Sequence, residues 1–327
     1  MDKHLGLIIS LLPGIKATEK IQLLLSLQTE EDLFLQTKRD IEKILERTLL
    51  KFWDISEIND KAGRIGTICK MRSINWGSWL DDAYPPLLRE IYDPPPVVFY
   101  RGSLPNPCKP LLGMVGTRKP SREAGEQAFK IAADIARCGI SVVSGLALGI
   151  DAMSHRGNLA GNVPGYAVLG SGIDEVYPSA NRPLAKKILD SGGALISEYP
   201  PGVHPGKWTF PARNRIISGL SRSVLIVEAP EKSGALITGS FALEHGKELW
   251  VASQGIAEGA YDRRGTQKLA QDGAEIINSA SDILEKWNLK ENQLSGCYAA
   301  FNEKKIHQSG SRETLVSSMA DFLGIEI

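Results

Sequence analysis

Residues 111–150 read LLGMVGTRKPSREAGEQAFKIAADIARCGISVVSGLALGI, and this stretch decides the fold. It opens with an apolar run of strand length, which a polar segment from Gly116 to Ser121 interrupts. Ser121 can cap a helix, because the apolar residues between 124 and 136 cluster at helical spacing. Gly139 ends that helix, and ISVVSG begins a second strand. The stretch therefore predicts a parallel strand–helix–strand crossover.

The two loops that follow these strands are expected to lie side by side. A parallel crossover places the carboxyl ends of both strands at one edge of the sheet, where open α/β sheets bind ligands. The loops are GTRKPS at residues 116–121 and SGLALG at residues 144–149. We expect Gly145, Ala147 and Gly149 to let a ligand approach the backbone closely, because their side chains are absent or small.

The same loops offer charge suited to an anion. Arg118 can donate two hydrogen bonds to a phosphate group. Asp151 is placed to cap the helix after the second loop, and amide groups at a helix N-terminus favour an anion. Residues 101–137 carry seven basic and three acidic side chains, and residues 182–222 carry seven basic and two acidic side chains. The sequence therefore predicts a phosphate site, although the whole chain carries no net charge.

Strand and helix patterns alternate along the following residues. Strands are expected at residues 166–170, 194–199, 223–229 and 248–253, with a short last strand in GAEIINS. Helices are expected around residues 151–161, 181–191, 213–220, 234–246 and 264–272, with a closing helix in SASDILEKW. This alternation is typical of a doubly wound α/β domain with a mostly parallel sheet and helices on both faces.

The residues before this domain are of two kinds. Residues 1–75 are expected to form a small helical domain, with helices in LGLIISLL, EKIQLLLSL and DIEKILERTLLKF and a break at Pro13-Gly14. Such a hairpin can contact DNA through its turn, but packing or protein contact fits better, because the first 60 residues carry eight basic and eleven acidic side chains. The prolines from residue 85 to residue 96 predict a linker before an edge strand in VVFYRG.

Composition excludes several classes of protein. The chain has 327 residues, 43% of them hydrophobic and 23% charged, which suits two or three globular domains. Its four cysteines lie far apart and form no C-x-x-C pair, so neither a zinc site nor a disulfide is expected, and a reducing cytoplasm is the expected compartment. The apolar segment at residues 5–12 is too short to span a bilayer, and it lacks the small-residue cleavage site of an export signal.

No motif for hydrolysis of a nucleoside triphosphate or for hydride transfer is present. The chain has neither G-x-x-x-x-G-K-[ST] nor a G-x-G-x-x-G fingerprint. Arg213, Asn214 and Arg215, in FPARNR, are candidate phosphate contacts at a helix start, and solvated surface charges are the alternative. Glu198 and Glu228, at strand ends, could act as an acid or a base, although pairing with arginine is the commoner role.

Two further groups have more than one interpretation. His155 could act as a base, but its place within a helix favours a structural histidine. Ser233, Gly234 and Thr238 either lie near the ligand edge or belong to one more strand–helix crossover, and the sequence favours neither. No spacing of residues indicates a metal site.

Seven motifs occur together and in order, and they resemble the DNA-processing protein DprA (Smf) family from about residue 76 to residue 285. The motifs are YPPLLREIYDPPPVVFYRG, VGTRKPS, VVSGLALGIDAMSH, AVLGSGIDEVYPSAN, LISEYPPG, FPARNRIISGLS and VLIVEAPEKSGALITGSFALEHGK. The N-terminal LLPGI hairpin also resembles the small helical domain that precedes the main domain in this family.

The resemblance implies an extended Rossmann-like fold that binds single-stranded DNA, protects it, and loads the RecA recombinase during natural transformation, as a homodimer without catalysis, cofactor or metal. We expect three parts: residues 1–75, residues 76–285, and a C-terminal tail at 286–327 in which the family's winged helix is absent or degenerate. Carried over by motif, the DNA-binding residues would be Gly116, Thr117, Arg118, Ser121, Ser144, Gly145, Gly149, Arg213, Asn214 and Arg215.

The chain departs from the family pattern at Ser154, where alanine is usual, at Gln254, where proline is usual, and at Gln267, where asparagine is common. Two other functions are kept as hypotheses. One is an N-glycosidic hydrolase acting on a nucleotide, as in the related lysine-decarboxylase-like group, but the P-G-G-x-G-T-x-x-E motif of that group is missing. The other is a nucleotide sensor with no role on DNA.

Overall fold

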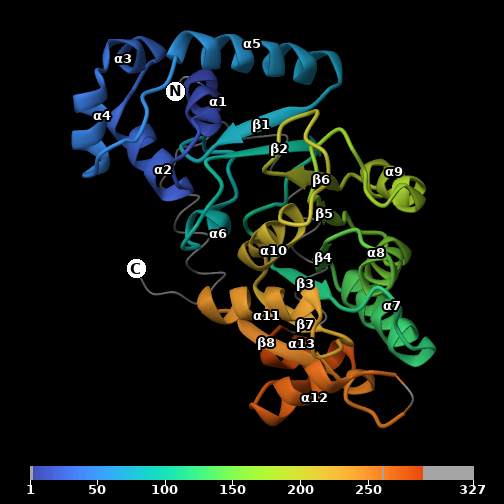
Figure 1. Cartoon of the computed structure of the whole chain (residues 1–327). Helices are drawn as coiled ribbons and strands as arrows, with labels where there is room; N and C mark the ends of the chain where they lie inside the picture. Colours follow the sequence, from blue (N-terminus) through green and yellow to red (C-terminus); the bar gives the residue numbers. More distant parts are fainter. Residues whose placement is uncertain (1–2, 260, 290–327) are drawn as a thin grey trace.

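A computed structural model describes residues 3–259 and 261–289 of the chain. These residues form one nine-stranded sheet with helices packed against it (Figure 1). The strands are β1 (Asn75–Ser78), β2 (Val97–Gly102), β3 (Leu111–Val115), β4 (Ser141–Ser144), β5 (Tyr166–Val168), β6 (Ala194–Ser197), β7 (Ser223–Ile226), β8 (Glu248–Ala252) and β9 (Glu275–Ile277). Their order in the sheet is β1-β2-β6-β5-β4-β3-β7-β8-β9. The predicted tail at 286–327 lies outside the described residues from residue 290 onward.

Seven of the strands are parallel. From β6 through β9 every neighbouring pair is parallel, whereas β1 and β2 form an antiparallel extension at one end. The strand order reverses direction at β3, which pairs with β4 on one side and β7 on the other. This is a switch point of the kind at which doubly wound sheets bind ligands. The fold class predicted from the sequence is therefore confirmed.

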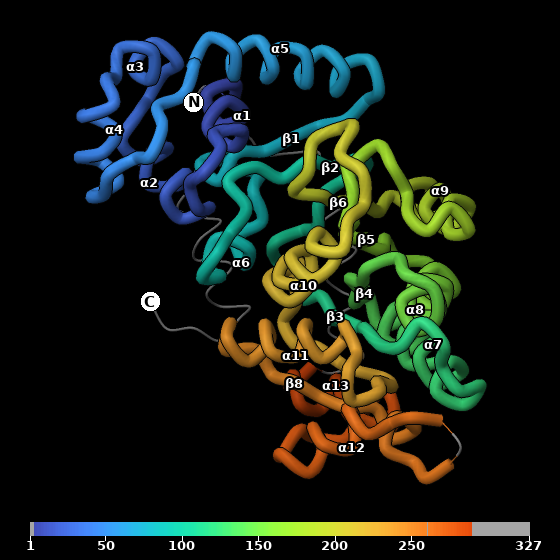
Figure 2. The backbone as a smooth tube through the Cα atoms, in the orientation of Figure 1, coloured from blue at the N-terminus to red at the C-terminus, as the bar shows by residue number. Residues whose placement is uncertain are grey.

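Helices cover both faces of the sheet, because alternate residues of each strand point to opposite sides. Leu111 and Val115 of β3 join a core with α10 (Thr209–Leu220) and α11 (Gly234–Glu244). Leu112 and Met114 of the same strand join a core with α7 (Arg122–Arg137) and α13 (Ala280–Lys286). The helices α8 (Ile150–Ala160) and α9 (Arg182–Asp190) follow α7 on that second face, and α12 (Arg264–Gln271) packs near β8 (Figure 2).

Five helices precede the sheet: α1 (Lys3–Leu11), α2 (Ala17–Ser26), α3 (Glu30–Leu35), α4 (Lys38–Leu45) and α5 (Ile55–Met71). Three helices were predicted from the sequence, and the third, in DIEKILERTLLKF, was predicted to be longer than it is. That helix ends at Leu45, because Glu46 takes a left-handed φ of 52°. The 17-residue α5 was missed, since its mixed polar and small residues give only a weak apolar stripe.

The helical segment shares a core with the sheet. Leu7 and Ile8 of α1 belong to the same buried cluster as Val97 and Phe99 of β2. The carbonyl groups of the hairpin turn are engaged within the protein, since Trp53 donates to Pro13 O at 2.9 Å and Arg47 donates to Gly14 O at 3.1 Å. The turn is thus held by internal contacts, while the division of the chain at residue 75 stays a prediction.

The interpretation of VVFYRG as an edge strand is wrong. This segment is β2, and it lies between β1 and β6. The edge is formed by β1, where Trp76 is opposite Phe99, and no strand was predicted for this segment. The prolines precede β2 and leave its ladder intact, and the carbonyl of Pro96 accepts a hydrogen bond from Trp79 N at 2.9 Å. A four-residue strand is too short to show a periodicity.

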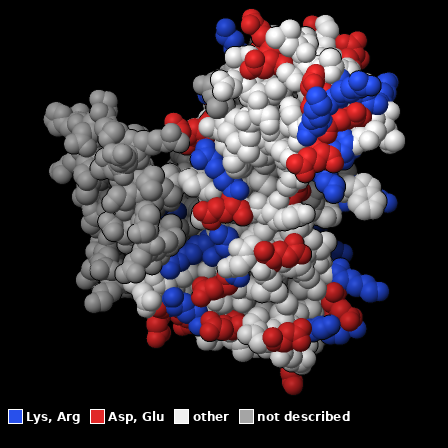
Figure 3. Space-filling view, turned by 90° about the vertical axis from the view of Figure 1, so that its left-hand side faces the viewer, with Lys and Arg blue, Asp and Glu red and all other residues white. Residues whose placement is uncertain are grey.

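Basic and acidic side chains are interspersed on the surface that Figure 3 shows. This view of the molecule carries no field of a single sign, in agreement with 38 basic and 38 acidic residues in the whole chain. Among the residues that the structure describes, no helix is both long enough and apolar enough to cross a membrane.

Candidate functional site

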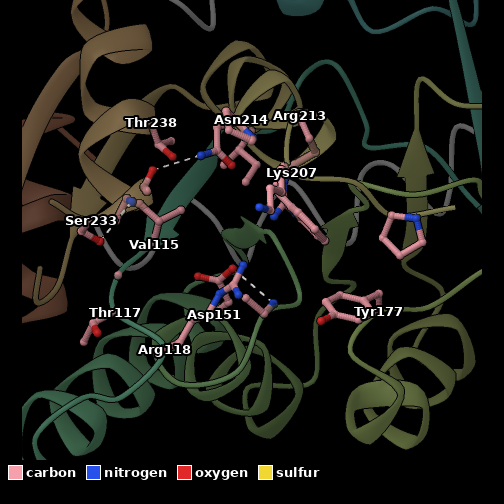
Figure 4. A pocket seen from close by; sticks show the side chains of 18 of the residues that line it. Val115, Thr117, Arg118, Asp151, Tyr177, Lys207, Arg213, Asn214, Ser233 and Thr238 are labelled. Atoms are coloured by element: carbon pink, nitrogen blue, oxygen red, sulfur yellow. Dashed lines mark hydrogen bonds between the residues drawn. The ribbon is translucent and has the colours of Figure 1, made fainter.

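A cavity of about 780 Å³ lies at the carboxyl end of β3, beside the switch point of the sheet. The loop after β3 forms one wall with residues 115–119. The segment 205–207 and the first turns of α10 form a second wall, and the beginning of α11 forms a third (Figure 4). Tyr177, from the loop between β5 and α9, completes the rim. The edge of the sheet at which a ligand was predicted to bind therefore contains a cavity.

One cation lies at the mouth of this cavity over an aromatic ring. Arg118 is exposed, and its guanidinium carbon is 5.6 Å from the centre of the Phe210 ring. Phe210 in turn contacts Tyr177, with ring centres 5.5 Å apart. A guanidinium held over a ring keeps its N–H groups free at its edge, so Arg118 can still bind a phosphate. Lys119 and Lys207 are exposed on the same rim.

Arg213 lines the cavity but is 5% exposed. Its Nη1 donates to Gly145 O at 2.7 Å and to Val168 O. Burial lowers the pKa of Arg213 to about 10, which leaves it charged at neutral pH, and Asp151 nearby opposes this shift. Burial also raises the pKa of Asp151, while Arg213 and the Ala147 amide, 3.3 Å from the carboxylate, oppose the rise. Arg213 is thus an internal counter-charge for Asp151.

Arg215 lies away from the cavity. Its Nη1 and Nη2 each donate to the Glu198 carboxylate at 2.7 Å, and its Nε donates to Asp93 O at 2.8 Å. The helix α10 begins at Thr209, four residues earlier than predicted, so Arg213 and Arg215 lie inside it. Side chains two positions apart on an α-helix are separated by about 200° of rotation around the helix axis, so they point in different directions. The sequence placed both arginines at a helix start as candidate phosphate contacts, whereas the structure brings Arg213 to the cavity and directs Arg215 away from it.

The glycines of the two loops serve contacts within the protein. A Cβ atom on Gly145 would lie 2.4 Å from the guanidinium of Arg213, and one on Gly116 would lie 2.6 Å from the Ile150 side chain. Gly149 has a φ of +77°, and its Cβ would lie 2.3 Å from Thr117 O. The space that a Cβ would take at Gly145 and Gly149 is filled by protein atoms, and neither glycine lines the cavity, so their role in binding stays a prediction.

Two serines among the candidates are also structural. Ser144 is fully buried and donates to Met114 O at 2.6 Å. Ser121 caps α7, as predicted, by accepting from Ala124 N at 3.2 Å. Asp151 is not the cap of α8, because Gly149 occupies that position and Asp151 lies in the first turn. Of the ten candidates, those that line the cavity are Gly116, Thr117, Arg118, Arg213 and Asn214.

A buried network of hydrogen bonds holds the loop at residues 116–121 in place. The two carboxylate oxygens of Glu228 accept from Ser121 N at 2.6 Å and from Arg263 Nε at 2.7 Å. Arg263 also donates to Ser121 Oγ at 3.0 Å, and Glu228 O accepts from Thr117 N at 2.7 Å. Arg263 and Glu228 are 5% and 1% exposed. Sequence reasoning missed Arg263, which is distant in the chain and belongs to no motif that it used.

His155 is fully buried, and neither ring nitrogen has a hydrogen-bond partner in the part of the chain that the structure describes. Burial, together with the nearby positive charge of Arg213, lowers its pKa to about 3. The imidazole is therefore neutral at physiological pH. It does not line the cavity, which agrees with the structural interpretation of this residue.

Two aromatic side chains and one lysine of the cavity were among the residues that the sequence did not predict. Tyr177 and Phe210 form its aromatic side, and Lys207 adds a positive charge. Tyr177 lies in the motif AVLGSGIDEVYPSAN and Phe210 begins FPARNRIISGLS, but neither was named as a candidate site residue. Lys207 lies beside Trp208, which is 86% exposed in the structure, and the signal available in the sequence was a lysine and a tryptophan just before FPARNR.

Ser233, Gly234 and Thr238 all line the cavity, so the interpretation that places them near the ligand edge agrees with the structure. Within the described residues, Asp151 is the one carboxylate that lines it. No cluster of His, Cys, Asp and Glu side chains there could hold a metal ion.

The departures from the expected motifs make internal contacts. Ser154 is buried and donates to Ile150 O at 2.9 Å. The backbone N–H of Gln254 donates to Gln127 Oε1 at 2.9 Å, and Gln267 donates to Ile256 O at 3.3 Å. None of these three side chains lines the cavity.

Comparisons with known proteins agree on one family. A family model described as DNA recombination-mediator protein A matches residues 76–288. The protein named Smf from Synechocystis is 43% identical over 208 residues, which cover 62% of this chain and 52% of that protein. The chain thus spans about half the length of that relative.

Two solved structures are also similar. DNA processing protein A from Streptococcus pneumoniae has a TM-score of 0.68 and 31% identity, covering 87% of this chain and 98% of that one. DNA processing protein A from Helicobacter pylori has a TM-score of 0.57 and 25% identity, and the match covers 65% of this chain and 95% of that one. The latter structure is described as giving insight into a single-stranded DNA binding mode of that protein.

Proposed function

Since this chain belongs to the DNA recombination-mediator protein A family, which includes proteins named DprA and Smf, we propose that it binds single-stranded DNA in the cavity beside β3. We further propose that it does not cleave the strand. The bound strand would lie across the carboxyl edge of the sheet, with phosphates toward the exposed cations and a base toward the aromatic wall.

The arrangement of Arg118 over Phe210 carries this proposal. Phosphate contacts from arginine and lysine supply most of the affinity for a nucleic acid of any sequence, and stacking on aromatic rings is the usual way to hold an unpaired base. Arg118, Lys119 and Lys207 supply the first kind of contact at this cavity, and Phe210 and Tyr177 supply the second. A paired base cannot stack on a side chain in this way, so the site favours single strands.

Among the predicted site residues, Gly116, Thr117, Arg118 and Asn214 are proposed to contact DNA directly, because they line the cavity. Arg213 is proposed to act mainly by holding Asp151, since both are buried. We assign Ser121, Ser144, Gly145, Gly149 and Arg215 to the support of the loops and of α10.

The internal bonds of the two glutamates support a role without catalysis. Glu198 is held by Arg215 and Glu228 by Arg263, each at 2.7 Å, and neither carboxylate lines the cavity. The hypothesis of an N-glycosidic hydrolase depended on these carboxylates, so it loses its basis in the sequence. No observation favours the nucleotide-sensor hypothesis over DNA binding.

The biological role is proposed from the family. We propose that the protein works in the cytoplasm as a homodimer, that it protects incoming single strands during natural transformation, and that it loads RecA onto them. Membership of the family supports these proposals. Loading would be measured as faster RecA filament formation on DNA that is covered by single-strand binding protein, and an unchanged rate would contradict it.

A gel shift with oligo-dT and a duplex of equal length tests the central proposal. We expect the single strand to be bound at lower protein concentration and recovered at full length after incubation. Equal or stronger binding of the duplex would contradict the proposal. Release of free base from the strand or from AMP would instead support the hydrolase.

A further inference from the structure

The helix α11 begins at the cavity and directs its N-terminus toward it. Ser233 caps this 11-residue helix by accepting from Ala235 N at 3.2 Å, and Ser233, Gly234 and Ala235 all line the cavity. The first amide groups of a helix lack acceptors within the helix, and they carry the positive end of its dipole. An anion in this part of the cavity would therefore be stabilised by α11.

A second observation points to a ligand at the same place. The Thr238 hydroxyl lines the cavity one turn into α11, the residue is 1% exposed, and its Oγ1 has no hydrogen-bond partner in the described part of the chain. A threonine within a helix normally donates to the carbonyl four residues earlier. Here that carbonyl, on Gly234, already accepts from Asn214 Nδ2 at 3.1 Å. An unpartnered buried hydroxyl costs stability, so it indicates a partner that is bound in function.

We propose that the N-terminus of α11 and the Thr238 hydroxyl form a phosphate subsite, distinct from the contact that Arg118 makes. This proposal rests on the proposed function and deepens it, because it lets the cavity hold a ligand by phosphate on two sides. Figure 4 shows Thr238, Ser233 and Asn214 on one side of the cavity and Arg118 with Thr117 on the opposite side.

Charge around the subsite favours a phosphate over a cation. Asp151 is the carboxylate that lines the described cavity, and its buried neighbour Arg213 offsets it. Glu231, near the start of α11, is paired with Arg264 at 3.7 Å. Lys207 lines the same cavity and is exposed. The donors at α11 are therefore not opposed by a free negative charge inside the cavity.

The subsite is tested by Thr238→Val, which removes the hydroxyl and keeps the branched shape. Because Thr238 Oγ1 has no hydrogen-bond partner among residues 3–259 and 261–289, this variant should unfold at the same denaturant concentration as wild type or a higher one. Its affinity for fluorescent oligo-dT should fall about tenfold, since a hydrogen bond to a charged group is lost. Thr238→Ser should restore most of the affinity. Ser240→Ala is the matched control, because Ser240 lies on the exposed side of α11 and donates to Leu236 O.

Oligo-dT with a 5′-hydroxyl and with a 5′-phosphate distinguishes two sources of the phosphate group. Equal weakening of both ligands by Thr238→Val means that the subsite takes an internal phosphodiester. Weakening of the phosphorylated ligand alone means that it takes a strand terminus, and dTMP should then compete better than thymidine.

Two results would overturn the subsite. If Thr238→Val binds both ligands as well as Ser240→Ala while Arg118→Ala binds them weakly, the subsite is wrong and the proposed function stands. If the wild-type protein binds neither ligand, the proposed function and the subsite fail together.

Discussion

Arg215 donates two hydrogen bonds of 2.7 Å to the carboxylate of Glu198, and this pairing holds it away from the cavity that Arg213 lines. Both arginines come from one short motif, yet each neutralises a different carboxylate, the partly buried Glu198 in one case and the buried Asp151 in the other. The arginines of this motif therefore make contacts within the protein, and the exposed cations of the rim are the ones proposed to contact DNA.

Arg215→Met should destabilise the protein by about 3 kcal/mol, because it leaves Glu198 in a mostly buried place without its partner. Denaturant unfolding measures this loss. The double variant Arg215→Met with Glu198→Gln should recover part of it. The folded single variant should bind oligo-dT within about twofold of wild type, and a large loss of affinity at unchanged stability would show that Arg215 contacts DNA.

His155 should make stability depend on pH. Its folded pKa of about 3 lies below the ordinary histidine pKa of 6.5, so its contribution is fully present above pH 6.5 and is lost as the pH falls toward 3. Between about pH 6 and pH 4 the unfolded chain binds one proton more, which corresponds to about 1.4 kcal/mol per pH unit. His155→Gln should lack this part of the slope in denaturant unfolding. An identical slope in both proteins would mean that the folded imidazole protonates normally.

Arg263→Met should loosen the loop that carries Arg118. It leaves the carboxylate of Glu228 buried without its cation and removes the donor to Ser121 Oγ. We expect a loss of about 3 kcal/mol in stability, together with weaker binding of oligo-dT. Adding Glu228→Gln should recover stability more than affinity. If Arg263→Met keeps full affinity at a temperature where it is folded, the network does not position the loop.

Phe210→Leu should weaken binding of oligo-dT by about tenfold, because stacking of one base on a ring contributes about 1–3 kcal/mol. Phe210→Tyr keeps the ring and should bind nearly as well as wild type. Tyr92→Ala serves as a control, since Tyr92 is 86% exposed and does not line the cavity. Fluorescence anisotropy gives all three affinities, and a similar loss for Phe210→Tyr and Phe210→Leu would argue against stacking.

The framework of the fold could be predicted from the sequence because it depends on local patterns. The strand β3, the cap at Ser121 and the stop at Gly139 are each specified by neighbouring residues. The strand β1 and the helix α5 were missed, because the first has four residues and the second has no strong apolar stripe. Both are stabilised by packing against distant parts of the chain.

The place of the cavity could be predicted from the sequence, but the partners of its charged groups could not. The edge of the sheet followed from the parallel crossover, and Arg118 was placed on it correctly. The partner of each charged group depends on residues distant in sequence, such as Glu198 for Arg215 and Glu228 for Arg263. A start of α10 four residues earlier than expected was enough to turn Arg215 away from the cavity.

The salt dependence of oligo-dT binding by Arg118→Ala tests the central claim most directly. Arg137→Ala is the matched control, because Arg137 is exposed at the other end of α7 and pairs with Asp134. Loss of one phosphate contact should weaken binding about fivefold or more and lower the slope of log affinity against log salt by about 0.7. The account predicts both changes for Arg118→Ala and neither for Arg137→Ala. Equal affinities and equal slopes for the two variants would contradict it.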